Sequence, residues 1–276
     1  MPIIAMTQEA GSQGKEVAQQ VAEKLGLELV CHRVFEQHVA DKLHADGTLV
    51  HRFLQGKPGL LDRWKTDHGA LSAYTAEQIY EIAIRGNVLI RGWGATYLLR
   101  PVAHVLCARI CAPVAHRLEV LIERLGISEK EARAKVAAND AARTTTMRAL
   151  RQDEWDNGPA YDLVLNSARV PVAECVAEVI RLVGEPAFQE TAESRAKLAA
   201  LRREAQVRAA LRADTATSGV GSFVKVITDP HDGFIALEGA VQTYDQKRDT
   251  ERVVAGLSWV SSVENRLHVV GPCTME

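Results

Sequence analysis

The sequence has few cysteines, and they form no recognisable motif. The five cysteines have spacings that match no metal-binding or redox pattern, and they are Cys31, Cys107, Cys111, Cys175 and Cys273. Cys107 and Cys111 fall in an apolar, strand-like run, where packing in the core explains them. The lack of a disulfide pattern favours a reduced, cytoplasmic setting.

The sequence also has no large excess of charge of one sign and no long apolar run. The formal net charge is −2 and the isoelectric point is near 6.5, so bulk attraction to nucleic acid or to an anionic membrane is not expected. Residues 1–6 carry no basic side chain, so we expect no signal peptide. No apolar run approaches the roughly 20 residues of a membrane span. We therefore expect a cytoplasmic protein without a nucleic-acid partner or a transmembrane segment.

The first two thirds of the chain alternate between strand-like and helix-like segments. Residues 3–6 and 27–30 are short apolar runs, and apolar residues recur at helical spacing from Val17 to Leu25. A strand, a helix and a strand of this length predict a parallel pair with a right-handed crossover. Further strands are expected at 87–90, 104–111 and 162–166, and helices at 114–125, 128–142 and 171–183. This alternation predicts an α/β domain with a parallel sheet flanked by helices.

The pattern changes after Gly184-Glu185-Pro186. An alanine-rich amphipathic helix is expected at 190–212, followed by a hairpin that turns at Asp232-Gly233 between the runs 223–228 and 234–241. A helix at 245–257 and a strand at 263–270 complete a small α+β unit. We therefore predict two domains, 1–185 and 186–276, which fold separately and are joined by an exposed stretch within 186–222.

A glycine-containing turn lies between the first predicted strand and the first predicted helix. Such a turn points backbone N–H groups and a helix N-terminus at an anion, and its full pattern is G-x-x-x-x-G-K-[ST]. Gly14-Lys15 fit the end of this pattern, whereas Glu9 stands at its first glycine and Glu16 at its hydroxyl position. The pattern alone leaves open a glycine-capped turn with a solvated lysine.

Longer stretches of the chain resemble one family. Residues 7–18 resemble the S-R-E-x-G-S-G-G-R-E-I-A opening of the cytidylate kinase-like family. Residues 112–117 resemble its A-P-x-x-x-R segment, and residues 125–132 resemble its G-[LI]-S-x-x-E-A turn. Asp140, Arg143 and Trp155 match its D-x-x-R…W stretch, and residues 161–167 match Y-D-L-x-[IL]-N-T. The matches keep the family's order over about 1–183.

This resemblance implies a nucleoside monophosphate kinase of the P-loop type, which would transfer a phosphoryl group from ATP, with magnesium, to CMP or a related nucleotide. Catalysis of that reaction depends on positioning and charge neutralisation. The implied catalytic residues are Lys15 and Arg143. The implied phosphate-binding residues are Gly11, Ser12, Gln13, Gly14, Lys15, Arg117, Arg148 and Arg151. Arg91, Trp93 and Asp162 are the acceptor-site candidates, and no protein metal site is expected. The alternative for the arginines is a solvated helix surface.

The chain departs from the family's pattern at two positions. Gln13 replaces a loop glycine, and Trp93 stands where the family's G-R-G-A segment has an arginine, with Arg91 close by. These departures keep open a second function class, a catalytically inactive nucleotide-binding or scaffold protein.

The C-terminal residues resemble a different family, the BON domain. Residues 232–241 match its x-G-x-V-x-L-x-G-x-V core, and residues 252–267 match its A-x-x-V-x-G-V-x-x-V-x-N-x-L ending. The resemblance implies a binding module for a protein or phospholipid partner, with no chemistry of its own. The predicted surface mixes both charge signs, with Lys225, Lys247, Arg248, Arg252 and Arg266 against Asp229, Asp232, Asp245, Asp249 and Glu251. Protein contact or homo-oligomerisation therefore fits at least as well as membrane binding.

Overall fold

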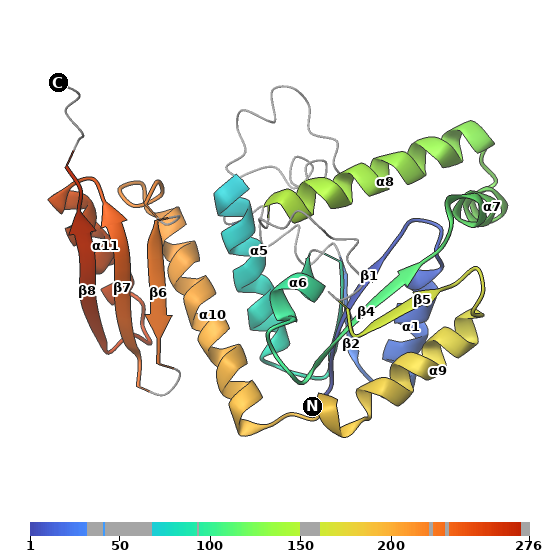
Figure 1. The fold of residues 1–276 in the computed structure, drawn as a ribbon, viewed down its shortest axis with the longest axis horizontal. Helices are drawn as coiled ribbons and strands as arrows, with labels where there is room; N and C mark the ends of the chain where they lie inside the picture. The colour runs from blue at the N-terminus through green and yellow to red at the C-terminus, as the bar shows by residue number, and fades with distance from the viewer. Residues whose placement is uncertain are drawn as a thin grey trace.

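A computed structural model describes residues 1–31, 41, 68–92, 94–149, 161–220, 223–229 and 232–271. The first unit is a five-stranded sheet in the order β2-β3-β1-β4-β5, flanked by helices (Figure 1). Its strands are β1 (Ile3–Gln8), β2 (Glu28–Val30), β3 (Val88–Arg91), β4 (Val105–Cys111) and β5 (Leu163–Asn166). Its helices are α1 (Gly14–Leu25), α5 (His68–Ala83), α6 (Ala95–Leu99), α7 (Val114–Leu125), α8 (Glu129–Ala149) and α9 (Val172–Val183).

A second, smaller sheet in the order β6-β7-β8 follows toward the C-terminus. The sheet consists of β6 (Val224–Thr228), β7 (Phe234–Val241) and β8 (Ser262–Val269). Two helices precede it, η2 (Pro186–Phe188) and α10 (Ala192–Ala213), and α11 (Tyr244–Ala255) connects β7 to β8. The predicted fold class, a parallel sheet flanked by helices and followed by a small α+β unit, is confirmed. Within the described residues, no helix is long and apolar enough to cross a membrane.

All strands of the first sheet are parallel, but the order of the strands differs from one expectation. The pattern at the start of the chain predicted that β1 and β2 pair directly. That prediction is wrong, because β3 lies between them and pairs with both. β3 comes much later in the sequence, and spacing along the chain cannot reveal that a later strand is inserted between two early ones.

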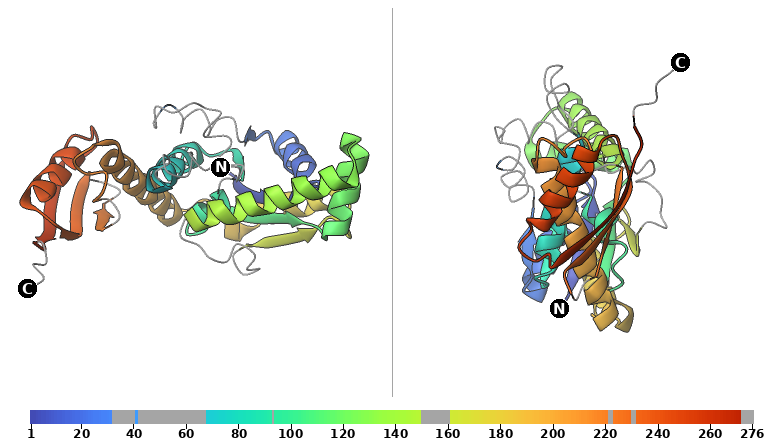
Figure 2. Two further views of the ribbon diagram at one scale, coloured as in Figure 1. Left: turned by 90° about the horizontal axis from the view of Figure 1, so that it is seen from above. Right: turned by 90° about the vertical axis from the view of Figure 1, so that its left-hand side faces the viewer.

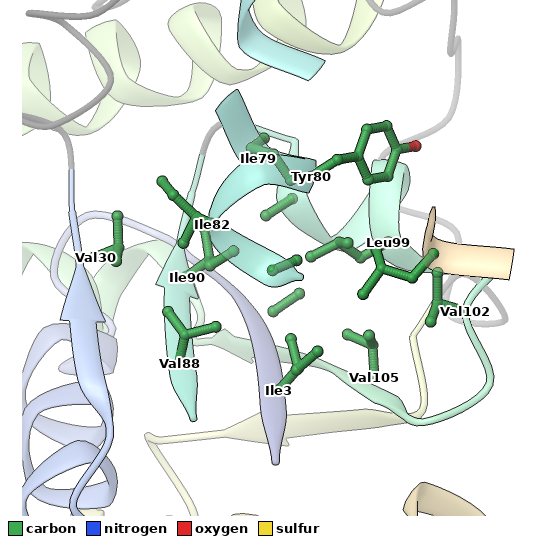
Figure 3. Close-up of a cluster of buried hydrophobic side chains, with 14 of the residues drawn as sticks. Ile3, Val30, Ile79, Tyr80, Ile82, Val88, Ile90, Leu99, Val102 and Val105 are labelled. Atoms are coloured by element: carbon green, nitrogen blue, oxygen red, sulfur yellow. The ribbon is translucent and has the colours of Figure 1, made fainter. Parts of the chain in front are cut away.

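The first sheet is buried on both faces, and alternate residues of its central strand serve different layers. Ile3 and Ala5 of β1 face α5 and α6, whereas Ile4 and Met6 face α1 and α9. Figure 3 shows the first of these layers, where labelled side chains of β1, β3 and β4 meet those of α5. Figure 2 shows the sheet between its two helical layers. This burial on both sides explains why β1 reads as an unbroken apolar run.

Helix α10 belongs to both cores. Leu198 and Ala205 pack into the first core with α5, and further along the helix Val207 and Leu211 pack into the core of the C-terminal sheet. Glu81 of α5 accepts a hydrogen bond from the Gln206 side chain of α10. Figures 1 and 2 show α10 between α5 and the small sheet. A stretch within 186–222 that was expected to be an exposed linker is therefore largely a packed helix, while the domain boundary near 185 stays a prediction.

The C-terminal sheet has one covered face and one open face. α10 and α11 contribute to a core with Val224, Ile235 and Leu267 on the covered face. On the open face, Lys225 and Arg266 lie on either side of Glu238, at 3.3 Å and 3.2 Å from its carboxylate oxygens. Arg266 also pairs with Glu264, at 2.6 Å, so these two cations and two carboxylates neutralise one another. The helix-hairpin-helix-strand order agrees with the sequence expectation.

The start of α10 is held by a buried polar contact. The His104 ring, which is 2% exposed, has its Nδ1 atom 2.7 Å from the Ser194 hydroxyl. Burial lowers the pKa of His104 below its ordinary value of 6.5. Glu190 opposes this shift, whereas the amino terminus and Arg195 add to it. The folded protein therefore favours the neutral ring.

We expect the protein to lose stability as the pH falls below 6.5 because of His104. The folded protein binds fewer protons than the unfolded chain between the lowered pKa and 6.5, so stability rises with pH in this interval and is complete above it. One such group contributes a slope of at most about 1.4 kcal/mol per pH unit. Urea unfolding of the wild type and His104→Asn at several pH values measures it. Equal slopes in the two proteins would contradict the assignment.

Candidate functional site

The candidate site lies at the carboxyl edge of the first sheet, where β1 turns into α1 (Figure 1). We call residues 9–15 the glycine loop. Two of its residues have left-handed backbone conformations, Gly11 with φ 83° and Gln13 with φ 55°. Gln13 is the residue before the first turn of α1, and its carbonyl accepts hydrogen bonds from the N–H groups of Glu16 and Val17.

One end of the glycine loop is anchored to the sheet by Ser12. Its hydroxyl is fully buried and donates to the carbonyls of Glu9, at 2.8 Å, and Ile110, at 3.1 Å. The Ser12 N–H donates to the Glu9 carbonyl, and the Ala10 N–H donates to the Asn139 side chain. Ser12 therefore shapes the loop and has no side-chain group to offer a ligand.

The other N–H groups of the loop are available to a ligand. Within the residues that the structure describes, the backbone N–H groups of Gly11, Gln13, Gly14 and Lys15 donate to no protein acceptor. They lie at the N-terminus of α1, where the helix dipole attracts negative charge. The Lys15 side chain is exposed, and no carboxylate among the described residues forms an ion pair with it. This arrangement can bind an anion such as a phosphate group.

Gly11 lies directly against the start of α7. A Cβ atom added to it would be 2.3 Å from the carbonyl oxygen of Arg117. Gly26, at the end of α1, also has a positive φ of 64°, but a Cβ atom there would meet nothing within 4 Å. A side chain at Gly11 would therefore cause both backbone strain and a steric clash, whereas one at Gly26 would cause backbone strain alone.

We expect Gly11→Ala to distort the loop and to abolish anion or nucleotide binding. Gly26→Ala carries only the conformational cost of about 1–2 kcal/mol and should leave binding unchanged. Urea unfolding and a nucleotide-binding titration of both variants measure the difference. Equal losses of stability and binding would contradict the close approach at Arg117.

A cluster of four charged side chains, three of them buried, lies against the glycine loop: Glu9, Arg109, Arg117 and the half-buried Asp140. Glu9 accepts a 2.7 Å hydrogen bond from Arg109 and another, at 3.2 Å, from the N–H group of Ala112. Arg117 pairs with Asp140 of α8 through both guanidinium ends, at 2.7 Å and 3.2 Å. The loop therefore rests on side chains from β4, α7 and α8.

The structure places the predicted arginines at different points of this edge. The Arg117 guanidinium is buried and bonded to protein, so its phosphate contact stays a prediction that would require another conformation. Arg143 and Arg148 lie on α8, but their side chains fall outside what the structure describes, as does all of Arg151. Arg143 is one helical turn beyond Asn139, which contacts the loop.

The structure describes two of the three acceptor-site candidates, Arg91 and Asp162, and places them at different strands of the sheet. Arg91 ends β3, beside Met6 of β1, which is near the loop. Trp93 lies outside the described residues. Asp162 precedes β5, and its carboxylate accepts a 2.7 Å hydrogen bond from the Cys107 N–H group, so it is used within the sheet. Of the two described candidates, Arg91 is the one whose backbone lies beside β1 near the loop.

Sequence reasoning missed the roles of Glu9, Arg109 and Asn139. Arg109 stands in the apolar run that forms β4, and a charged residue in a buried strand requires a buried partner. That signal was available in the sequence. The partner itself is 100 residues away in the chain, at Glu9, and could not be identified from spacing.

No protein metal site is evident near the loop. Within the described ranges, no three His, Cys, Asp or Glu side chains are grouped so that they could hold a metal ion. Glu16 stands at the hydroxyl position of the motif and forms an ion pair with Arg124. The magnesium ion that the resemblance implies stays a prediction.

The fold and the site define a kinase-type α/β protein. The chain belongs to the Cytidylate kinase-like family, whose profile matches residues 3–169. It is 25% identical over 176 residues to a cytidylate kinase of Pyrobaculum aerophilum, covering 64% of this chain and 89% of that protein. It is 26% identical over 180 residues to a cytidylate kinase of Pyrobaculum neutrophilum, with the same coverage.

A solved structure shares the fold. An uncharacterized protein from Eubacterium ventriosum superposes with a TM-score of 0.53 at 18% identity, covering 66% of this chain and 98% of that one. This likeness concerns the fold alone. The family profile thus matches the first unit, within residues 3–169.

Proposed function

We propose that the first unit is a nucleoside monophosphate kinase that transfers a phosphoryl group from ATP to CMP or a related nucleotide. The observation that carries the proposal is the set of free N–H groups at Gly11, Gln13, Gly14 and Lys15. Membership of the Cytidylate kinase-like family supports the same reaction class. The loop grips the phosphates of ATP, and the acceptor nucleotide binds nearby at the carboxyl edge.

The charged residues have separate tasks in this proposal. Lys15 reaches the outer phosphates from the start of α1. Arg143 approaches from α8, one turn beyond the residue that contacts the loop. Both neutralise charge on the transferring group, which is the main requirement for phosphoryl transfer. We assign the acceptor side to Arg91, at the end of β3, and the support for this proposal is that its backbone lies beside β1 near the loop.

Gln13 does not exclude this function. The residue adopts the left-handed conformation that a glycine would adopt freely, with φ 55°, so the backbone follows the loop's path at some cost in strain. Its N–H group remains available to a phosphate oxygen. Glutamine in place of glycine at position 13 therefore lowers the stability of the loop more than it lowers the loop's capacity to bind phosphate.

A coupled ADP-release assay across the nucleoside monophosphates, with ATP and magnesium, tests the proposal. We expect robust turnover with CMP or a closely related acceptor. Nucleotide affinity without turnover, measured by calorimetry, would support the alternative of a non-catalytic nucleotide-binding protein. A protein with neither nucleotide affinity nor turnover would contradict both the kinase and the nucleotide-binding function.

For the C-terminal unit we propose a BON-like binding module without chemistry of its own. The order α10, β6, β7, α11, β8 supports this proposal. Lys225 and Arg266 are paired with Glu238, and Arg266 is also paired with Glu264, so two cations and two carboxylates balance on that part of the open face. This balance favours a protein partner over an anionic membrane. We expect no co-sedimentation with anionic vesicles at physiological salt. Strong binding to them would contradict the preference for protein.

A further inference from the structure

We propose that Asn139 and Asp140 are positioning residues that fasten α8 to the glycine loop and so set where Arg143 stands. The two residues hold the loop from both sides of Ala10. Asn139 accepts from the Ala10 N–H group at 3.1 Å, and Asp140 holds Arg117, which donates to the Ala10 carbonyl at 2.8 Å. Only the kinetic part of this inference rests on the proposed function.

Arg117 is the centre of this connection, and all of its nitrogen atoms are engaged. Its Nε atom donates to Ala10, and its two Nη atoms donate to the two Asp140 oxygens. Nη1 also lies 3.5 Å from Oε2 of Glu9. A guanidinium held at a backbone carbonyl and two carboxylates has a fixed orientation. Arg117 therefore acts as a rigid link between the loop and α8.

Burial makes the link strong. The side chains of Arg117 and Glu9 are 5% and 7% exposed, whereas that of Asp140 is 34% exposed. Glu9 also pairs with Arg109, so two cations and two carboxylates neutralise one another under the loop. Removing one carboxylate would leave a buried guanidinium without full compensation, which is costly. The arrangement thus favours a single position of α8 over the loop.

The helix carries this constraint to Arg143. Residues 139 and 143 are four apart on α8, so they share one face of the helix. α8 runs along the carboxyl edge of the sheet (Figures 1 and 2), and the Ala10–Asn139 hydrogen bond attaches α8 to the glycine loop there. A group that neutralises a transferring phosphate must be placed within a fraction of an ångström, and a shift of about 1 Å can cost roughly a hundredfold in rate.

Asp140→Asn and Asn139→Ala in the full chain test the inference, with Glu129→Gln as the matched control. Glu129 forms an exposed ion pair with Arg133 on the same helix, and both side chains are 63% exposed. The first measurement is amide hydrogen exchange without nucleotide. We expect exchange in residues 10–14 and 129–142 to rise by roughly tenfold or more in Asp140→Asn, because a charge-assisted hydrogen bond is lost, and by less in Asn139→Ala. Glu129→Gln should match the wild type.

The second measurement separates positioning from binding. In Asp140→Asn, kcat should fall by roughly 10- to 100-fold, while the dissociation constant of ATP changes by less than about threefold. Asp140→Glu, which keeps the carboxylate, should recover part of the rate. Unchanged exchange in Asp140→Asn would overturn the inference, as would parallel losses of ATP affinity and kcat. If the wild type shows no turnover, the proposed function fails, and the exchange experiment still decides whether α8 is fastened to the loop.

Discussion

Replacing Lys15 by alanine should lower the rate of phosphoryl transfer by a few hundredfold and change the affinity for ATP only slightly. Lys15 is exposed at the start of α1 and has no carboxylate partner among the described residues, so its charge is free to act on a ligand. Charge on the transferring group develops most in the transition state, and losing one preorganised electrostatic contact costs about 3–4 kcal/mol there.

The ground state should suffer less from this change. The N–H groups of Gly11, Gln13 and Gly14 remain in place and provide much of the grip on the bound phosphates. An interaction that is stronger in the transition state than in the ground state lowers kcat when it is lost. Steady-state kinetics and calorimetry with ATP measure the two effects separately.

Lys24→Ala is the matched control, because Lys24 is an exposed lysine in the last turn of the same helix. It should have the kinetics of the wild type. Arg143→Ala should resemble Lys15→Ala if Arg143 shares the task. A wild-type rate in Lys15→Ala, with turnover in the parent protein, would show that the glycine loop is not the phosphate site.

The sequence predicts the layers of the fold well, because burial leaves a local signature. The short apolar run at residues 3–6 predicted a strand, and Ile3 and Ile4 of that strand contribute to opposite layers. The order of strands has no local signature. The insertion of β3 between β1 and β2 depends on the path of the whole chain, so the predicted β1–β2 pair was wrong.

The sequence predicted the backbone of the candidate site better than the contacts of its side chains. The glycines marked the loop, since a positive φ at Gly11 requires a residue without Cβ in this crowded position. The cluster beneath the loop joins Glu9, Arg117 and Asp140 from three distant parts of the chain. The resemblance of residues 112–117 to the family implied that Arg117 binds phosphate. Only the structure reveals that the Arg117 guanidinium donates to the Asp140 carboxylate.

An amphipathic helix was predicted at 190–212 and is observed as α10, but the two cores against which it packs were not predicted. Its apolar residues near Leu198 face one core, and those near Leu211 face another. A single apolar stripe in a sequence does not indicate that a helix passes from one core to the next. The expectation of two separately folding units stays a prediction, which the following experiment tests.

We expect Leu198→Ala to destabilise the whole protein by about 2–5 kcal/mol, the usual cost of truncating a fully buried leucine. Leu198 is 2% exposed and packs against α5 in the first core, although it lies beyond the predicted boundary at 185. Leu211 is fully buried in the second core on the same helix. Because one continuous helix joins the two cores, Leu211→Ala should shift the same unfolding transition. Urea unfolding followed by far-ultraviolet circular dichroism and by tryptophan fluorescence should give coincident curves for each variant.

Lys197→Ala is the control for this experiment, since Lys197 is exposed next to Leu198 and should change stability by no more than about 0.5 kcal/mol. A chain that ends at residue 190 extends the test. It lacks α10, so the apolar face of α5 that Leu198 and Ala205 cover would meet water, and we expect a lower melting temperature and aggregation. Two separate transitions, one moved only by Leu198→Ala and the other only by Leu211→Ala, would instead mean that α10 does not couple the units. A shortened chain with the full melting temperature would lead to the same conclusion, and the boundary predicted at 185 would then separate two domains that fold alone.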